Sequence, residues 1–302
     1  MTGSQQRAAT ELLGKKFKVS QRRAARALGS NRSTVRYRAK TRDDEAKLVA
    51  AIRKLARRHP RYGYRRIHAR LVATGWTVNR KRVRRLWRRL GLKVRIRRKS
   101  RGRSGHPGTS ANSCMAKPAT AVKDVWTCDF VQSRTMSGGL LKWLSVVDEY
   151  TRELLVLVPA ASLSGADVRR WFGRLVGWRG WPQSVRCDNG GEFVGAALAE
   201  WLKSKGVELR AVAPASPWEN GFVESFHSRL RDEFLDRVLL ENVADAKAQA
   251  EAFKKEFNTV RPHSGLGYQT PRAFAATCSG PEPEKTKTKT KTKNPGERKT
   301  AK

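Results

Sequence analysis

Three acidic side chains stand where carboxylates could bind a metal ion. Asp129 lies inside the apolar run WTCDFV, which predicts a strand, and a charge there is costly without a partner. Asp188 follows the strand-like run SVRC and opens the turn DNGGEF, at a strand end where open α/β sheets place their ligands. Glu224 lies in SPWENGFVESF, and on a helix it would sit roughly 160–200° around from the seam of Phe222 and Phe226. Three clustered carboxylates repel one another and need cations, and their hard oxygen atoms suit Mg²⁺, with Mn²⁺ as a substitute.

Each carboxylate also has an ordinary structural explanation. Asp188 could cap its own turn, and Glu224 could be a solvated surface residue. Asp129 could pair with one of the many arginines. Asp148 and Glu149 in VVDEYTRE are alternative carboxylates on another predicted strand. Taken one at a time, these residues leave the alternatives open.

The charge of the chain is strongly positive and unevenly distributed, with a net +38 over 302 residues. Residues 1–110 hold 35 Lys and Arg against 4 Asp and Glu, whereas residues 111–276 hold 21 against 19. Clustered basic side chains favour nucleic acid as the partner, because neutralising phosphates releases counterions. An acidic membrane surface is the rival partner, but the sequence has no long apolar run and no obvious amphipathic anchor. The N-terminus also lacks the apolar core of a signal peptide, so we expect a cytoplasmic protein.

The first basic unit, in residues 18–38, has the pattern of two short helices. Ser20 is a good N-cap, Gly29 breaks the first helix, and a second helix carries Val35 and Tyr37. This pattern predicts a helix-turn-helix whose second helix enters the major groove, and a plain basic hairpin is the alternative. The DNA contacts expected on the second helix are Arg32 and Arg36.

The second basic unit, YGYRRIHARLVATGWTVNRKRVRRLWRRLGLKV, again predicts two helices. Ile67, Leu71 and Val72 form one apolar face, and Asn79 can cap the following helix. That helix has inward-facing Val83, Leu86, Trp87 and Leu90 and an outer row of arginines. Five arginines within eight residues would repel one another unless an anion lies alongside, which favours DNA over a merely solvated face. The expected DNA contacts are Arg82, Arg85 and Arg89.

The remaining chain alternates between strand-like and helical patterns. Strands are predicted at 125–131, 142–150, 153–158, 184–187 and 207–212, and helices at about 164–178, 192–205 and 243–258, besides the helix of Glu224. A meander of three strands followed by helix–strand alternation indicates an α/β domain with a mixed sheet covered on both faces. The predicted domains are a basic helix-turn-helix at 1–45, a second basic helical unit at 46–95, a flexible basic linker at 96–120, the α/β domain at 121–276 and a disordered Lys/Thr tail at 277–302.

Together, the motifs WTCDF, VVDEYTRE, CDNGGEF and SPWENGFVESFHSRLRDE resemble the DDE core of bacterial insertion-sequence transposases related to retroviral integrases, most closely insertion-sequence family three. The spacing agrees, because 35 residues lie between Asp188 and Glu224 (224 − 188 − 1). The segment FNTVRPHSGLGYQTP is typical of the family apart from Phe257. HPRYGYRRIHARL and VNRKRVRRLWRRLGL resemble its helix-turn-helix segment, so the resemblance covers about residues 18–276.

The resemblance implies an RNase H-like fold, with a mixed five-stranded sheet and flanking helices. The first strand, the fourth strand and a helix would bring Asp129, Asp188 and Glu224 together as catalytic metal ligands. Two ions would be held, with Asp129 bridging them. Water would be the nucleophile for nicking at the element's end, and the freed 3′-hydroxyl the nucleophile for strand transfer.

The resemblance also assigns supporting residues. Arg231 matches the basic residue that closes the motif, and it shares a helical face with Glu224 and Ser228, which positions Ser228 and Arg231 for DNA phosphates. His227 could touch DNA or be an ordinary residue of the helix surface. The resemblance assigns Asp148 and Glu149 a structural role. Asn189 and Asn220 are expected to support the site through hydrogen bonds to its ligand residues or through contacts with DNA.

The expected partners are DNA, at the element ends and at the target, and further copies of the chain, because synapsing two ends requires at least two protomers. A small upstream DNA-binding protein, joined by translational frameshifting, is a possible fusion partner. The expected location is the bacterial cytoplasm, at the nucleoid, with no membrane association. Two rival functions remain, a DNA-binding regulator without catalysis and a metal-dependent nuclease that cuts without joining.

Overall fold

The computed structural model describes residues 1–37, 42–94, 117–188, 190, 193, 195–212 and 221–278. The chain divides into two compact units, Met1–Lys54 and Leu55–Lys302. The linker predicted at 96–120 and the tail predicted at 277–302 lie almost wholly outside the described residues, as do Asn189 and Asn220. None of the described helices is long and apolar enough to cross a bilayer.

The first unit, Met1–Lys54, contains the predicted pair of short helices, an unpredicted helix before them and most of a further unpredicted helix, α4 (Glu45–Arg58). The pair is α2 (Gln21–Ala27) and α3 (Arg32–Arg36), and the hydroxyl of Ser20 accepts the Arg23 N–H at 3.3 Å as the N-cap. Between them the backbone of Gly29 has φ +60°, a conformation that favours glycine. The unpredicted helix α1 (Gly3–Phe17) begins with a capping box between Thr2 and Gln5. Tyr37 is 61% exposed and follows the end of α3, so it does not accompany the buried Val35.

The second basic segment of the sequence, YGYRRIHARLVATGWTVNRKRVRRLWRRLGLKV, lies within the compact unit Leu55–Lys302. It forms two helices as predicted, α5 (Tyr64–Ala73) and α6 (Arg80–Arg89). Asn79 caps α6 as predicted, since its side chain accepts the Lys81 N–H at 2.8 Å. Ile67 and Leu71 are fully buried, but Val72 is 50% exposed, so its predicted place on the apolar face is wrong. Ile67 and Leu71 are four residues apart and share a face, whereas Val72 is turned about 100° from Leu71. Val83, Leu86 and Trp87 of α6 are buried as predicted, and Leu90 is partly buried.

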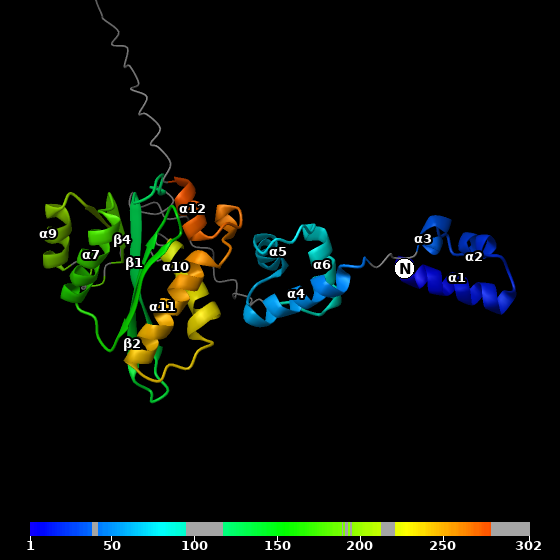
Figure 1. Cartoon of the computed structure of the whole chain (residues 1–302), viewed down its shortest axis with the longest axis horizontal. Helices are drawn as coiled ribbons and strands as arrows, with labels where there is room; N and C mark the ends of the chain where they lie inside the picture. Colours follow the sequence, from blue (N-terminus) through cyan, green and yellow to red (C-terminus); the bar gives the residue numbers. More distant parts are fainter. Residues whose placement is uncertain are drawn as a thin grey trace, which may run out of the picture. The chain divides into compact units, whose positions relative to one another are not determined.

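Five strands form one mixed sheet in the order β3-β2-β1-β4-β5 (Figure 1). They are β1 (Val125–Arg134), β2 (Leu140–Asp148), β3 (Leu154–Ala160), β4 (Ser184–Cys187) and β5 (Glu208–Ala211). The first three pair antiparallel as a meander, whereas β4 pairs parallel to both β1 and β5. All five predicted strands are therefore confirmed, with small shifts at their ends.

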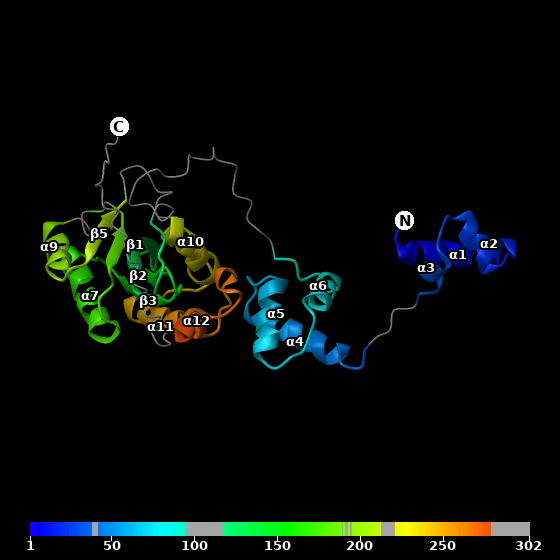
Figure 2. The same cartoon turned by 90° about the horizontal axis from the view of Figure 1, so that it is seen from above.

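Helices cover both faces of this sheet, as Figures 1 and 2 show. One face carries α7 (Gly165–Arg179) and α9 (Ala196–Ser204), and the other carries α10 (Gly221–Leu230) and α11 (Val243–Thr259). Ser164 and Asp167 form a capping box that starts α7. The strand order, the antiparallel meander and the two parallel strands make this the predicted RNase H-like fold.

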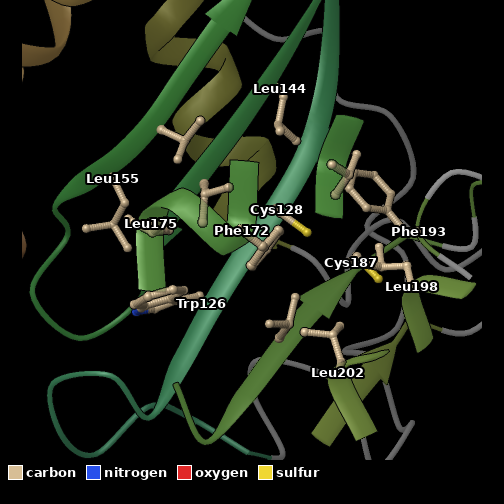
Figure 3. Packing of buried hydrophobic residues seen from close by; sticks show 14 of the residues in the cluster. Trp126, Cys128, Leu144, Leu155, Phe172, Leu175, Cys187, Phe193, Leu198 and Leu202 are labelled. Atoms are coloured by element: carbon tan, nitrogen blue, oxygen red, sulfur yellow. The ribbon is translucent and has the colours of Figure 1, made fainter. Parts of the chain in front are cut away.

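Two apolar clusters lie on opposite faces of the sheet. The cluster under α7 and α9 includes Trp126, Cys128, Phe172 and Cys187 (Figure 3). The cluster under α10 and α11 includes Val131, Trp143, Phe226, Leu230 and Phe257. Because side chains alternate along a strand, β1 supplies Cys128 to the first cluster and Val131 to the second.

The helix of Glu224 changes its type before Arg231, which the sequence analysis placed on the same helical face as Glu224. Its α-helical part stops at Leu230, and Arg231–Leu235 form a π-helical turn. Beyond α11, a short 3₁₀ turn (Ser264–Leu266) and α12 (Pro271–Cys278) complete the described residues, and neither was predicted.

Candidate active site

The register between β1 and β4 brings two of the three carboxylates to one place. The parallel pairs run from Val125 beside Ser184 to Thr127 beside Arg186. Continuing that register by two residues sets Asp129 beside Asp188, just past the end of β4. The two aspartates are 59 residues apart in the chain (188 − 129), so hydrogen bonding within the sheet makes them neighbours.

Glu224 reaches the same place from helix α10. Cys128 points into the cluster under α7 and α9, so its neighbour Asp129 faces the α10 side of the sheet. On α10, Val223 and Phe226 are buried while Glu224 is exposed. The negative charges of Asp188 and Glu224 both act on the Asp129 carboxyl.

The pKa of the Asp129 carboxyl is raised by its surroundings. The pKa is raised to about 7, and burial of the side chain, which is 21% exposed, is the largest cause. The neighbouring charges of Asp188 and Glu224 contribute to the rise, while the Phe130 N–H, which donates to Oδ1 at 2.6 Å, opposes it. A carboxyl in this position takes up either a proton or a cation near neutral pH.

Asp188 also has the structural role that was the alternative explanation. Its Oδ1 accepts the Gly190 N–H at 3.1 Å, which caps the turn. A carboxylate has further lone pairs, so this hydrogen bond leaves Asp188 able to bind a cation. The alternative for Asp129, a pair with an arginine, is wrong within the described part of the chain, where the basic side chain beside its carboxyl is a histidine.

That histidine is His227, whose place was not predicted. Its Nδ1 lies 3.6 Å from Oδ2 of Asp129, and its Nε2 lies 2.8 Å from the hydroxyl of Ser145. The Ser145 hydroxyl donates to the Asp129 carbonyl at 3.1 Å, and a hydroxyl has one proton, so Nε2 of His227 must be the donor to Ser145. Burial and then the charge of Arg231 lower the pKa of His227 to about 4, so the ring is neutral and presents the Nδ1 lone pair to Asp129. The sequence held one signal for this contact, a serine inside the apolar strand run KWLSVVD.

The donor set fits a divalent metal ion. All three carboxylates offer oxygen, the ligand that Mg²⁺ prefers. Among the described residues, no three His, Cys, Asp or Glu side chains already stand close enough together to hold an ion. The repulsion felt by Asp129 is the electrostatic condition that a bound cation would relieve.

Comparison with known proteins agrees with this architecture. Models described as "Integrase core domain" match residues 119–217 and 205–271, and one described as "HTH-like domain" matches residues 42–100. A protein of insertion element IS407 from Burkholderia multivorans is 38% identical over 86% of this chain and 92% of its own length. The chain belongs to the insertion-sequence transposases with an integrase core, insertion-sequence family three.

Other relatives and structures are more distant. A protein of insertion element IS476 from Xanthomonas euvesicatoria is 34% identical, over 85% of this chain and 73% of its own length. Among solved structures, a chain of the simian T-cell lymphotropic virus intasome aligns at 14% identity with a TM-score of 0.47. That alignment covers 58% of this chain and 62% of that chain.

In the integrase core, the two alternative carboxylates on β2 have structural partners. Asp148 is buried and accepts hydrogen bonds from the Trp126 indole and three backbone N–H groups. Glu149 pairs with Arg186, and both side chains are fully buried. The prediction that Asp148 and Glu149 are structural is therefore confirmed.

The residues predicted to contact DNA lie mostly on the surface. On α10, Ser228 is exposed, and so is Arg231, which opens the π-helical turn that follows. Arg231 still acts electrostatically on His227, four residues earlier, so it stays near the carboxylates. In the basic helical units the exposed predicted contacts are Arg32, Arg36, Arg85 and Arg89, with Arg82 partly buried.

Proposed function

We propose that this chain catalyses metal-dependent nicking at the ends of an insertion element, followed by strand transfer through attack of the freed 3′-hydroxyl on target DNA. The observation that supports the proposal is the sheet register that sets Asp129 beside Asp188, with the charge of Glu224 on α10 acting on the same carboxyl. Membership in the transposase family supports the same reaction.

Asp129, Asp188 and Glu224 would hold two Mg²⁺ ions, with Mn²⁺ as a substitute. Bound ions of this kind activate an attacking oxygen and stabilise a leaving one in an in-line displacement. The protein itself would hold the three carboxylates in position for the ions. Asp129 must lose its proton to act as a ligand, and with a pKa of about 7 it does so at neutral to mildly alkaline pH. Nε2 of His227 donates to Ser145, whose hydroxyl donates to the Asp129 carbonyl, so these two residues hold the backbone at Asp129.

DNA would be bound by the helical units and by the surface beside the carboxylates. The proposed contacts are Arg32, Arg36, Arg82, Arg85 and Arg89 in the helical units and Asn189, Asn220, Ser228 and Arg231 in the core. Two element ends have to be joined in one event, so we infer that at least two copies of the chain act together on DNA. A small upstream DNA-binding protein, fused or separate, remains part of the proposal.

The test is a plasmid assay of nicking and joining in Mg²⁺, with the flanking DNA of the element as substrate. Glu224→Gln keeps the helix and the side-chain volume but removes a charged ligand. Glu200→Gln, an exposed acid on α9, is the matched control. We expect the wild type and the control to nick and join, and Glu224→Gln to do neither.

Other outcomes would change the assignment. Equal activity of Glu224→Gln and the wild type would refute the active site. Cutting without joining by the wild type would favour a nuclease. Binding without any reaction by all three proteins would favour a regulator, unless adding the upstream partner restored cutting.

A further inference from the structure

We propose that a cavity on another side of helix α10 binds a backbone phosphate of the DNA strand that the active site processes. The proposal rests on the proposed function and adds a second place at which this helix holds the substrate. The cavity measures about 470 Å³ and lies between α10, the end of α11 and the turn at Ser264–Leu266.

The cavity lies beside the catalytic face of α10 but does not include it. Five α10 residues line it, Gly221, Phe222, Ser225, Phe226 and Arg229, whereas Glu224 does not. At about 100° per residue, Ser225 and Arg229 point about 100° and 140° away from Glu224. A strand crossing α10 at Glu224 can therefore reach the cavity with a neighbouring phosphate.

The lining is strongly basic. Its described residues include four arginines, Arg66, Arg152, Arg229 and Arg261, and no acidic side chain. Glu233 lies behind the lining and pairs with two of them, Arg66 at 2.8 Å and Arg261 at 2.6 Å. Burial and then the positive charges of Arg261 and Arg66 lower the pKa of Arg229, and an anion entering the cavity would relieve this repulsion.

Apolar side chains in the cavity strengthen the attraction between its arginines and an anion. Val147, Phe226 and Phe257 line the same cavity and are buried, so they form an apolar wall beside the arginines. Arg261 is 2% exposed, and its guanidinium also donates to Nε2 of His263 at 2.8 Å. The pKa of His263 falls to about 2, first through burial and then through Arg261 and the other arginines, so the ring adds no charge of its own.

Phosphate is the anion that this site fits. Arginine presents several N–H donors in a planar fork that matches phosphate oxygens, and the Ser225 hydroxyl adds a donor on the same wall. The shared chemistry could come from a DNA strand or from free phosphate, and the experiment separates the two sources.

Gly265 lines the cavity and offers a way to change its charge. A Cβ added there meets no atom within 4 Å, and the backbone is outside the left-handed region. Gly265→Glu adds an acid to the basic cavity, and Gly265→Gln adds the same volume without charge. Gly173→Glu and Gly173→Gln on α7, which also extend into open space, are the control pair for net charge. Arg229→Gln tests the same site by removing a cation.

Two measurements on the full chain follow. The first is the melting temperature in sodium phosphate against sodium chloride at equal ionic strength. We expect phosphate to stabilise the wild type, Gly265→Gln and the Gly173 pair, but not Gly265→Glu or Arg229→Gln. The second is the slope of log K against log salt for a labelled DNA duplex. The magnitude of this slope should be smaller for Gly265→Glu than for Gly265→Gln, by about 0.9 for each phosphate contact that is lost. The difference between Gly173→Glu and Gly173→Gln should be smaller than that.

Each outcome decides something. Equal behaviour of Gly265→Glu and Gly265→Gln in both measurements overturns the proposal. A phosphate effect without a change of slope shows that the cavity takes free phosphate and overturns the assignment to DNA. Neither readout needs catalysis, so both can succeed even if the Glu224→Gln assay refutes the proposed active site.

Discussion

Replacing Asp129 with asparagine should make the metal-free protein more stable at alkaline pH, although it removes a predicted catalytic ligand. In the folded chain the pKa of this carboxyl is raised to about 7 by burial and by Asp188 and Glu224. A raised carboxyl pKa means that the folded state binds the proton more tightly than the unfolded state does. The resulting stability is fully present below about pH 4 and is lost as the pH rises to about 7. Asparagine carries no charge, so the variant does not suffer this loss.

The size of the effect follows from the pKa. A rise from 3.8 to about 7 is about 3 pH units, or about 4 kcal/mol at 1.36 kcal/mol per unit. The side chain is 21% exposed and solvent screens part of the repulsion, so we expect about 2 kcal/mol. For a domain of this size, about 2 kcal/mol corresponds to roughly 4–8 °C in melting temperature. The Phe130 N–H can still donate to the amide oxygen of asparagine, so the local fold should survive.

The assay is thermal unfolding from pH 4 to pH 9 in chelator, for the wild type, Asp129→Asn and Glu200→Gln. The difference between Asp129→Asn and the wild type should grow between pH 4 and pH 7 and then stay constant. Mg²⁺ should then raise the melting temperature of the wild type and not that of Asp129→Asn. The reasoning about the carboxylate cluster would be refuted if the difference in melting temperature between Asp129→Asn and the wild type did not change across this pH range. A lower melting temperature of Asp129→Asn than of the wild type at pH 8 would refute it as well.

Three further predictions concern other parts of the chain. Glu149→Gln breaks the buried ion pair with Arg186 and should cost about 3–5 kcal/mol in urea unfolding; a loss below about 1 kcal/mol would contradict the pair's burial. His227→Ala removes the ring that, through Ser145, holds the backbone at Asp129, a proposed metal ligand, and nicking should then need about 10–100-fold more Mg²⁺; an unchanged Mg²⁺ dependence would show that the ring does not position Asp129. Arg85→Ala and Arg89→Ala should each lower the salt slope of DNA binding by about 0.9, and an unaltered slope would remove them from the DNA interface.

Sequence patterns predicted the secondary structure of the core well, because its signals are local. Alternating and continuous apolar runs predicted all five strands, and Ser20 and Asn79 marked helix starts that the structure confirms. The errors are also local. Val72 and Tyr37 are apolar residues that are exposed, and apolar character alone does not say which side of a short helix is covered. The π-helical turn after Leu230 carried no recognisable signal.

Residue types and spacing were enough to nominate Asp129, Asp188 and Glu224 and to favour DNA as the partner, because charge and carboxylate chemistry belong to the side chains themselves. Only the tertiary structure decided which groups surround them. The pairing of β1 with β4 sets Asp129 beside Asp188, and the packing of α10 on the sheet brings His227 against Asp129. Such neighbours come from segments 59 to 98 residues apart (188 − 129 and 227 − 129), and burial between them changes a pKa by about 3 units. Contacts between distant segments depend on how layers pack, and that information is absent from the spacing of residues along the chain.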